Sequence, residues 1–484
     1  MAAIMIQGCG SDVGKSVIVA GICRLFANRG FKVRPFKPQN MSNNAAVTAD
    51  GGEIGRAQAL QAMACRTPAT VDMNPVLLKP QSDTGAQVVV RGRVAGTWQA
   101  RAFQDKKSEL LDVVLESFRS LQSQSDLVIV EGAGSPAEIN LRQGDIANMG
   151  FARAAHVPVV LVGDIDRGHV IAALAGAHTV LETADRDMIQ GFIINKFRGD
   201  PTLFQDGRTE ITRRTGWRDL GMIPWLSSIR KLPAEDAVIL DDAPRTSAAT
   251  VKIVVPMLSR IANFDDFDPL QNEPQVQFAY IPPGSPLPGD ADLVILPGTK
   301  ATLADLAFFR AQGWDIDLAA HVRRGGAVLG VCGGFQMLGR TIADPDGLEG
   351  VTGQVAGLGL LDVDTVLTGD KILQPASGML AGSDARFEGY EMHVGRTTGD
   401  GLKNPYLMIG NRPDGAVSSN GRIMGTYVHG LFASGAVRAA ILGRFGATSD
   451  GANHADLIDS LLDDIATSLE SSLDIEALAA IAGL

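Results

Sequence analysis

The chain has 484 residues, 45% hydrophobic and 20% charged, with a formal net charge of −11 from 54 acidic and 43 basic side chains. Single domains average ~150 residues, so several domains are expected, and the balanced composition argues against a disordered chain. The negative charge argues against a general nucleic-acid binder, and no stretch reaches the ~18 apolar residues of a membrane helix. Four scattered cysteines and an N-terminus without a cationic leader predict a cytoplasmic protein with free thiols.

Short apolar runs typical of strands alternate with helical patterns in the first half of the chain. The strand-like runs are Ile4–Gln7, Lys32–Phe36, Leu127–Glu131, Val157–Val162 and Phe192–Asn195. Helical spacing of apolar residues covers Lys15–Asn28, Glu53–Cys65 and Lys106–Leu121. The alternation predicts βαβ units and a doubly wound parallel sheet. We therefore assign residues 1–228 to a first α/β domain.

A polar, proline-containing stretch from Ser227 to Thr250 interrupts this pattern, and we expect a linker over residues 229–250. The α/β pattern then resumes, which predicts a second doubly wound domain over residues 251–450. Its expected strands are Val251–Pro256, Val276–Ile281, Leu293–Leu296 and Ala327–Val331, and its expected helices are Thr302–Gln312 and Phe335–Thr341. Residues 451–484 form a C-terminal tail, in which Ala455–Leu484 has the pattern of two amphipathic helices.

The first strand runs into a glycine-rich loop that is followed by Lys15, Ser16 and a helix. Glycines let backbone N–H groups surround phosphate oxygens while the helix N-terminus adds a positive end, so this pattern predicts a P-loop. Gly14 would contribute its backbone, Lys15 would reach the β and γ phosphates of ATP, and Ser16 would bind Mg²⁺. Gly8 and Gly14 enclose five residues, whereas the usual loop has four.

Carboxylates at the same sheet edge are candidates for the rest of a magnesium site. Glu131 ends an apolar strand, where ligands bind in open α/β sheets; a turn or capping role is the alternative. Asp50 and Glu53 are further candidates, with Glu53 preferred because we expect it to open a helix. Lys37, after another strand, could neutralise a transferring phosphoryl group, or it could be a solvated surface lysine.

In the second domain, Cys332 lies between the strand Ala327–Val331 and a helix and is flanked by small residues. A strand–turn–helix of this kind exposes a nucleophile, and the helix N-terminus favours the thiolate. We therefore predict that Cys332 is the reactive thiol. The remaining cysteines are expected to pack as small apolar side chains: Cys9, Cys23 and Cys65.

A thiol nucleophile needs a base, and histidine is the usual one. His429 follows a short strand-like run and is preferred over His393, which remains the rival on the residues alone. The strand end Leu296–Lys300 could supply oxyanion-hole N–H groups.

Many segments of this chain together resemble the cobyric acid synthases. In the first domain these are the loop from Gln7 to Ser16, Pro35–Met41, Asn74–Pro80, Glu131–Leu141, Asp164–Gly168 and Ile194–Asp200. In the second domain they are Val331–Gly339, Gly389–His393 and Tyr427–Phe432. The resemblance extends over nearly the whole chain except Ala455–Leu484.

The resemblance implies an enzyme that amidates adenosylcobyrinic acid a,c-diamide four times, with ATP and glutamine, to give adenosylcobyric acid. It implies a P-loop, dethiobiotin-synthetase-like domain fused to a class I-like glutamine amidotransferase domain. Its implied site residues are Ser16, Glu53 and Glu131 for Mg²⁺, Asn195 for the nucleotide base, and Cys332 with His429 for glutamine.

Two positions depart from what the resemblance leads us to expect. Ordinary class I enzymes have a glutamate two residues after the histidine, whereas this chain has Leu431, so we expect packing or backbone contacts to hold His429. His169 stands where we expect glycine.

Two other functions compete with this interpretation. Cobyrinic acid a,c-diamide synthase shares both halves but acts on earlier carboxylates, and a P-loop switch ATPase would have no use for Cys332 and His429. The expected partners are small molecules, namely a corrinoid polycarboxylate, L-glutamine and ATP, with no nucleic acid and no membrane. The candidate basic surface for the anionic corrinoid comprises Lys37, Lys79, Arg91 and Arg93.

Overall fold

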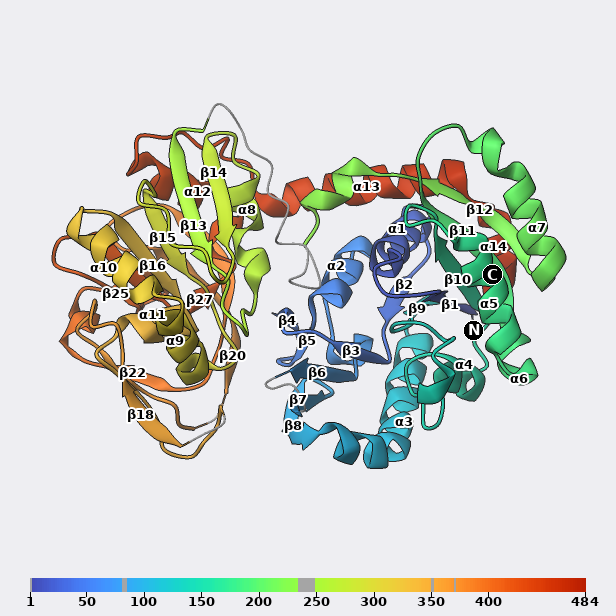
Figure 1. Cartoon of the computed structure of the whole chain (residues 1–484), viewed down its shortest axis with the longest axis horizontal. Helices are drawn as coiled ribbons and strands as arrows, with labels where there is room; N and C mark the ends of the chain where they lie inside the picture. Colours follow the sequence, from blue (N-terminus) through green and yellow to red (C-terminus); the bar gives the residue numbers. More distant parts are fainter. Residues whose placement is uncertain (1, 81–84, 234–248, 350–351, 370) are drawn as a thin grey trace. The chain divides into compact units, whose positions relative to one another are not determined.

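The computed structural model describes residues 2–80, 85–233, 249–349, 352–369 and 371–484 (Figure 1). It divides into two compact units. Unit 1 comprises Met1–Ser42, Thr48–Pro233 and Ile458–Leu484, and unit 2 comprises Asn43–Val47 and Ala234–Leu457. Most of the expected linker, 229–250, lies outside the described residues. No helix in the described ranges is long and apolar enough to cross a membrane.

Unit 1 is built on a six-stranded parallel sheet with the order β12-β11-β10-β1-β9-β2. Its strands are β1 (Ala2–Gly8), β2 (Val33–Phe36), β9 (Leu127–Glu131), β10 (Val159–Asp164), β11 (Ile189–Phe197) and β12 (Arg218–Pro224). All seven residues of β1 are buried, because a parallel sheet is covered on both faces. The register pairs Ile6 with Glu131, so the loops after β1 and β9 emerge at the same edge.

Helices cover both faces of this sheet, with α1 on one face and α3 and α4 on the other (Figure 1). The helices are α1 (Lys15–Asn28), α2 (Arg56–Ala64), α3 (Ala100–Ser123), α4 (Met149–Ala155), α5 (Val170–Val180), α6 (Thr183–Arg186) and α7 (Gln205–Thr215). The expectation that Glu53 opens a helix was wrong. Glu53 begins the strand β5 (Glu53–Gly55), and α2 starts at Arg56 after Gly55, whose backbone is extended.

A smaller four-stranded sheet, ordered β3-β6-β7-β8, also belongs to unit 1 and was not anticipated. Its strands are β3 (Gln39–Met41), β6 (Val76–Pro80), β7 (Gly85–Val90) and β8 (Arg93–Gln99).

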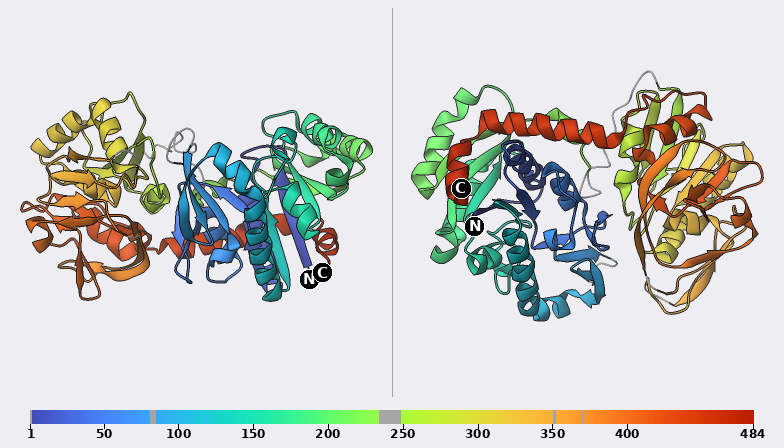
Figure 2. Two further views of the ribbon diagram at one scale, coloured as in Figure 1. Left: turned by 90° about the horizontal axis from the view of Figure 1, so that it is seen from below. Right: turned by 180° about the vertical axis from the view of Figure 1, so that it is seen from behind.

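The C-terminal segment Ile458–Leu484 packs within unit 1. It contains most of α13 (His454–Ser472) and all of α14 (Ile475–Ala482). Leu473 bridges to Gly221, and the fully buried Arg24 of α1 pairs with Asp459 at 2.5 Å. The two ends of the chain therefore lie near each other (Figure 2).

Unit 2 contains a second six-stranded sheet, with the order β14-β13-β15-β16-β26-β25. It is parallel except for the edge strand β25, which runs antiparallel. Its strands are β13 (Val251–Pro256), β14 (Val276–Ile281), β15 (Leu293–Leu296), β16 (Ala327–Val331), β25 (Ala416–Val417) and β26 (Ile423–Thr426). Its helices are α8 (Asp268–Gln271), α9 (Thr302–Ala311), α10 (Trp314–Arg323), α11 (Gly333–Leu338) and α12 (Gly435–Gly443).

The expected helix Phe335–Thr341 was too long at its C-terminal end. The helix α11 ends at Leu338 because Gly339 takes an extended conformation, and Thr341 opens β17 (Thr341–Asp344).

Two mainly antiparallel sheets, also unanticipated, complete unit 2. One is ordered β18-β17-β19-β22, with β18 (Gly353–Ala356), β19 (Asp364–Val366) and β22 (Arg396–Thr398). The other is ordered β24-β23-β20-β21-β27, with β20 (Ile372–Leu380), β21 (Arg386–His393), β23 (Leu407–Ile409), β24 (Arg412–Asp414) and β27 (Val428–His429). The pairing of β21 with β27 sets Tyr390 opposite His429.

Candidate active sites

The loop between β1 and α1 has the backbone that a P-loop requires. Gly14 has a φ of 95°, in the left-handed region that favours glycine, immediately before the first residue of α1. The ammonium of Lys15 donates to the carbonyl oxygens of Gly10 at 3.1 Å and Gly134 at 3.2 Å. The lysine is thus held between this loop and the loop that follows β9, at the positive end of α1.

Glu131 lies at the centre of a buried polar cluster at the same edge. One of its oxygens accepts from Ser16 Oγ at 2.8 Å and from Lys37 Nζ at 2.9 Å. The other accepts from Gln61 Nε2 at 2.5 Å and Gln58 Nε2 at 3.4 Å. The structure brings Ser16, Lys37 and Glu131 together, and Lys37 is buried rather than solvated. The sequence analysis missed Gln58 and Gln61, because both lie within the helix α2 and belong to no recognisable motif.

Glu53 and Asn195 have other partners. Glu53 pairs with Lys79 at 2.8 Å, and both side chains are buried. Asn195 Nδ2 donates to the carbonyl of Val13 at 2.8 Å, so it braces the loop from the end of β11. In the described residues no group of three or more His, Cys, Asp or Glu side chains could hold a metal by itself.

His169 precedes α5 with a φ of 55°. This is the left-handed region, which explains why glycine is the residue expected at this position.

Cys332 occupies a strained turn between β16 and α11. Its φ of 51° and ψ of −109° are unusual for a residue with a side chain. Its N–H donates to the carbonyl of Thr426 at 2.8 Å, and its Sγ lies 3.5 Å from the carbonyl oxygen of Met392. This geometry is that of a nucleophile elbow.

Burial disfavours the thiolate form of two of the other three cysteines. Burial raises the pKa of Cys9 to about 12 and the pKa of Cys23 well above its usual value. Both therefore stay protonated at neutral pH.

His429 is held by a carboxylate, contrary to the expectation from Leu431. Asp266, in the short 3-10 helix η6 (Phe264–Phe267), accepts from His429 Nδ1 at 2.7 Å and from the N–H of Gly430 at 2.8 Å. Leu431 is buried and apolar. The acidic run at residues 265, 266 and 268 gave no signal that singles out Asp266, because its partner is 163 residues away.

The environment of His429 favours its charged form. Burial alone would lower the pKa of this imidazole, but the charge and hydrogen bond of Asp266, assisted by Cys332, outweigh burial and raise the pKa to about 10. The ring of Tyr390 stacks on His429, with centroids 5.3 Å apart.

Gly298 brings the loop after β15 beside the same residues. A Cβ atom on Gly298 would lie 3.0 Å from His429 Cε1 and 3.8 Å from Cys332 Cβ. The segment Leu296–Lys300 therefore lies next to the nucleophile, where its backbone can approach a bound carbonyl.

His393 has a different environment. No side chain among the described residues hydrogen-bonds to either ring nitrogen, and the ring stacks on Tyr427 with centroids 3.7 Å apart. Burial lowers the pKa of His393 to about 4, so this side chain is neutral at physiological pH. A neutral ring with no bonded carboxylate is the poorer general base of the two histidines.

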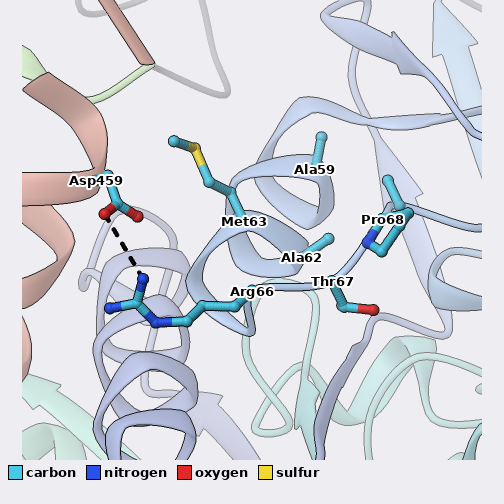
Figure 3. A pocket seen from close by; sticks show the side chains of 8 residues that line it. Ala59, Ala62, Met63, Arg66, Thr67, Pro68 and Asp459 are labelled. Atoms are coloured by element: carbon cyan, nitrogen blue, oxygen red, sulfur yellow. Dashed lines mark ion pairs between the residues drawn. The ribbon is translucent and has the colours of Figure 1, made fainter. Parts of the chain in front are cut away.

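A cavity of about 550 Å³ in unit 1 is lined by none of these residues (Figure 3). Its lining comprises Ala59, Ala62, Met63, Arg66, Thr67, Pro68, Ala69 and Asp459. The guanidinium of Arg66 extends toward Asp459, 3.7 Å away. The helix α2 thus faces Glu131 with Gln58 and Gln61 and lines this cavity with other side chains.

Comparisons with known proteins agree with a nucleotide-binding first part of the chain and a glutamine amidotransferase second part. Residues 4–239 match the family model described as the CobQ/CobB/MinD/ParA nucleotide binding domain. Residues 252–437 match the CobB/CobQ-like glutamine amidotransferase domain. Cobyric acid synthase of Caulobacter sp. (strain K31) is 69% identical over 486 residues, which covers 100% of both chains. The chain belongs to the cobyric acid synthase family.

Cobyric acid synthase of Brucella canis is 58% identical and covers 99% of both chains. A solved structure of PurLQS from Thermotoga maritima is 18% identical, with a TM-score of 0.29, and covers 44% of this chain and 99% of that one. Membership makes the chain an enzyme of cobalamin biosynthesis that forms amides, with a glutamine amidotransferase domain and a nucleotide-binding domain. The predicted fold class, two doubly wound α/β domains, is confirmed.

Proposed function

We propose that this chain amidates the b, d, e and g carboxylates of adenosylcobyrinic acid a,c-diamide to give adenosylcobyric acid, with ATP and glutamine as the other substrates. The observation that carries the proposal is the Cys332 elbow next to His429, in a chain that also has a P-loop. Full-length identity to cobyric acid synthases supports the choice of substrate.

In the glutaminase reaction, His429 holds the proton of Cys332 as an imidazolium, and the thiolate of this ion pair attacks the carboxamide carbon of glutamine. A carbon–sulfur bond forms, and the N–H groups near Gly298 stabilise the oxyanion. The carbon–nitrogen bond then breaks, and ammonia leaves with the proton from His429. Water, deprotonated by His429, hydrolyses the thioester to glutamate and restores the thiol.

In the ligase reaction, a corrinoid carboxylate attacks the γ-phosphorus of ATP, and ADP leaves. The resulting acyl phosphate has a good leaving group, whereas a free carboxylate would have to expel hydroxide. Ammonia attacks the acyl carbon, phosphate departs, and the amide is formed. Lys15 and Lys37 supply positive charge to the phosphoryl oxygens, and the N–H groups up to Gly14 hold them in place.

Ser16 and Glu131 suit a magnesium ion, because a hydroxyl and a carboxylate oxygen lie 2.8 Å apart at the loop that receives phosphates. Bound there, Mg²⁺ would neutralise phosphate charge. Glu53 is the third candidate ligand, and its carboxylate pairs with Lys79. Asn195 is proposed to contact the nucleotide base while it braces the loop.

The anionic corrinoid needs local positive charge in a chain of net charge −11. The proposed basic residues are Lys37, Lys79, Arg91 and Arg93. Of these, Lys37 and Lys79 pair with buried carboxylates, and Arg91 pairs with Asp72. We place the reaction in the cytoplasm.

The test compares two nitrogen donors in Cys332→Ala and Lys15→Ala. With ATP, Mg²⁺ and the a,c-diamide, Cys332→Ala should lose amidation from glutamine and keep it from ammonium salts at raised pH. Lys15→Ala should lose both, because it removes charge from the phosphoryl-transfer step.

Products are followed by mass spectrometry. The expected products are ADP, phosphate and corrinoids carrying up to four new amides. AMP with pyrophosphate would refute the acyl phosphate, and no amidation of the a,c-diamide would refute the substrate. Loss of ammonia-supported activity in Cys332→Ala would refute the role of the thiol.

A further inference from the structure

We propose that Asp266 is the positioning residue of the glutaminase site, fixing the orientation, tautomer and charge of His429. This inference rests on the proposed roles of Cys332 and His429. It places the third member of the site in η6, before the cysteine in the chain, and not after the histidine as in ordinary class I enzymes.

The first support is the two-point contact between Asp266 and the histidine turn. One carboxylate oxygen binds the ring at Nδ1 and the other binds the next backbone N–H, at Gly430. A carboxylate that only neutralised charge would need one contact. Two contacts on adjacent groups fix both the ring and the backbone that carries it.

The second support is burial. The side chains of Asp266 and His429 are 4% and 3% exposed, so solvent hardly screens their interaction. An ionised pair buried this deeply is costly unless its hydrogen bonds are satisfied, and here both carboxylate oxygens have partners. The pair is therefore part of the interior of the site and not an incidental surface contact.

The third support is the anchoring of η6 itself. Asn263, just before η6, has a φ of 52° and donates from Nδ2 to the hydroxyl of Tyr390 at 2.6 Å. The N–H of Asp266 donates to the carbonyl of Asn263 at 3.1 Å. Because Tyr390 stacks on His429, one cluster holds both the carboxylate and the imidazole.

The chemical consequence follows from the ring nitrogen that Asp266 uses. With the proton of Nδ1 directed at Asp266, Nε2 is the nitrogen that can exchange a proton with Cys332. When the thiol proton moves to Nε2, the imidazolium forms against a carboxylate that is already in place. Asp266 keeps its charge throughout and does not touch the substrate.

Among the described residues, four titratable side chains face or influence His429 from the elements packed around it. Asp266 comes from η6, Cys332 from the elbow, and Tyr390 and His393 from β21. Of these, only Asp266 carries a carboxyl group, so its removal isolates one interaction.

The experiment uses the full chain with Asp266→Asn and, as a matched change elsewhere in unit 2, Asp315→Asn. Asp266→Asn should lose about 100-fold or more in glutamine-supported kcat, with a smaller change in KM, and should keep ammonia-supported amidation. Iodoacetamide alkylation of Cys332, read by peptide mass spectrometry, should slow at least about tenfold near pH 6 and converge with the unaltered chain near pH 9.5. Asp315→Asn should change none of these.

Unchanged alkylation rates across pH in Asp266→Asn, or a glutamine-supported kcat within about threefold, would overturn the proposal. If Asp266→Asn does not fold, as judged by loss of ammonia-supported activity, ¹⁵N-histidine NMR of the unaltered chain decides. A proton on Nδ1 of His429 near pH 8 supports the role, and a ring protonated on Nε2 alone refutes it.

A different result would refute the proposed function, namely glutamine-supported turnover that is retained in Cys332→Ala. An inactive Cys332→Ala with a fully active Asp266→Asn would refute only the role of Asp266.

Discussion

Replacing Gly21 by alanine tests how the C-terminal segment packs on the P-loop helix. Gly21 lies in the middle of α1, and a Cβ atom there would lie 2.5 Å from Leu469 Cδ1 and 2.7 Å from Ile465 Cγ2 of α13. Contacts this short require the two helices to move apart or the side chains to leave their rotamers. Overpacking of this kind costs about 1–3 kcal/mol.

A second effect of Gly21→Ala has the opposite sign. Alanine in a helix interior stabilises by about 1 kcal/mol relative to glycine. The net result should be a destabilisation of about 1 kcal/mol. Gly176→Ala in α5 is the matched control, because a Cβ atom there meets nothing within 4 Å, and it should stabilise by up to about 1 kcal/mol.

Hydrogen exchange measured by mass spectrometry reports each helix locally, which avoids assuming two-state unfolding of a chain with two units. Exchange in the α1 peptides should become roughly fivefold faster in Gly21→Ala, whereas exchange in the α5 peptides should slow in Gly176→Ala. Adding Leu469→Ala should remove much of the effect of Gly21→Ala, since neighbouring substitutions are not additive. Slower exchange of α1 in Gly21→Ala would refute the packing of α13 on α1.

Two further variants test buried side chains that can carry charge. Lys37→Met should destabilise unit 1 by about 3 kcal/mol, because the buried carboxylate of Glu131 loses its cation. Adding Glu131→Gln should restore most of this stability but not the ligase activity. Equal unfolding midpoints for Lys37→Met and the unaltered chain would contradict this. His393→Phe should keep thioester formation at Cys332 and the stack on Tyr427. Because burial lowers the pKa of His393 to about 4, the unfolded chain binds an extra proton between about pH 6.5 and pH 4, so stability falls as pH falls through that window. His393→Phe should lessen this loss, and an unchanged pH profile of the melting temperature would contradict it.

The sequence alone determined the features whose causes are local. The P-loop follows from glycines, Lys15 and Ser16 at fixed spacing between a strand and a helix, and the elbow at Cys332 follows from small residues in the same arrangement. Parallel sheets could be predicted because both faces of each strand are buried, which leaves near-continuous apolar runs such as Leu127–Glu131. The strand Gly353–Ala356 of an antiparallel sheet was missed because none of its four residues is buried, so it lacks that pattern.

Only the tertiary structure decided which distant groups meet. Asp266 and His429 come together because η6 lies against the turn that carries His429 and Gly430, and no spacing rule relates residues 163 positions apart. The same holds for Glu131, which Gln58 and Gln61 approach from α2, and for Arg24, whose partner Asp459 lies 435 residues away. A buried charge requires a partner, but burial itself is set by the packing of whole elements, so the need for these partners arises only in the folded chain.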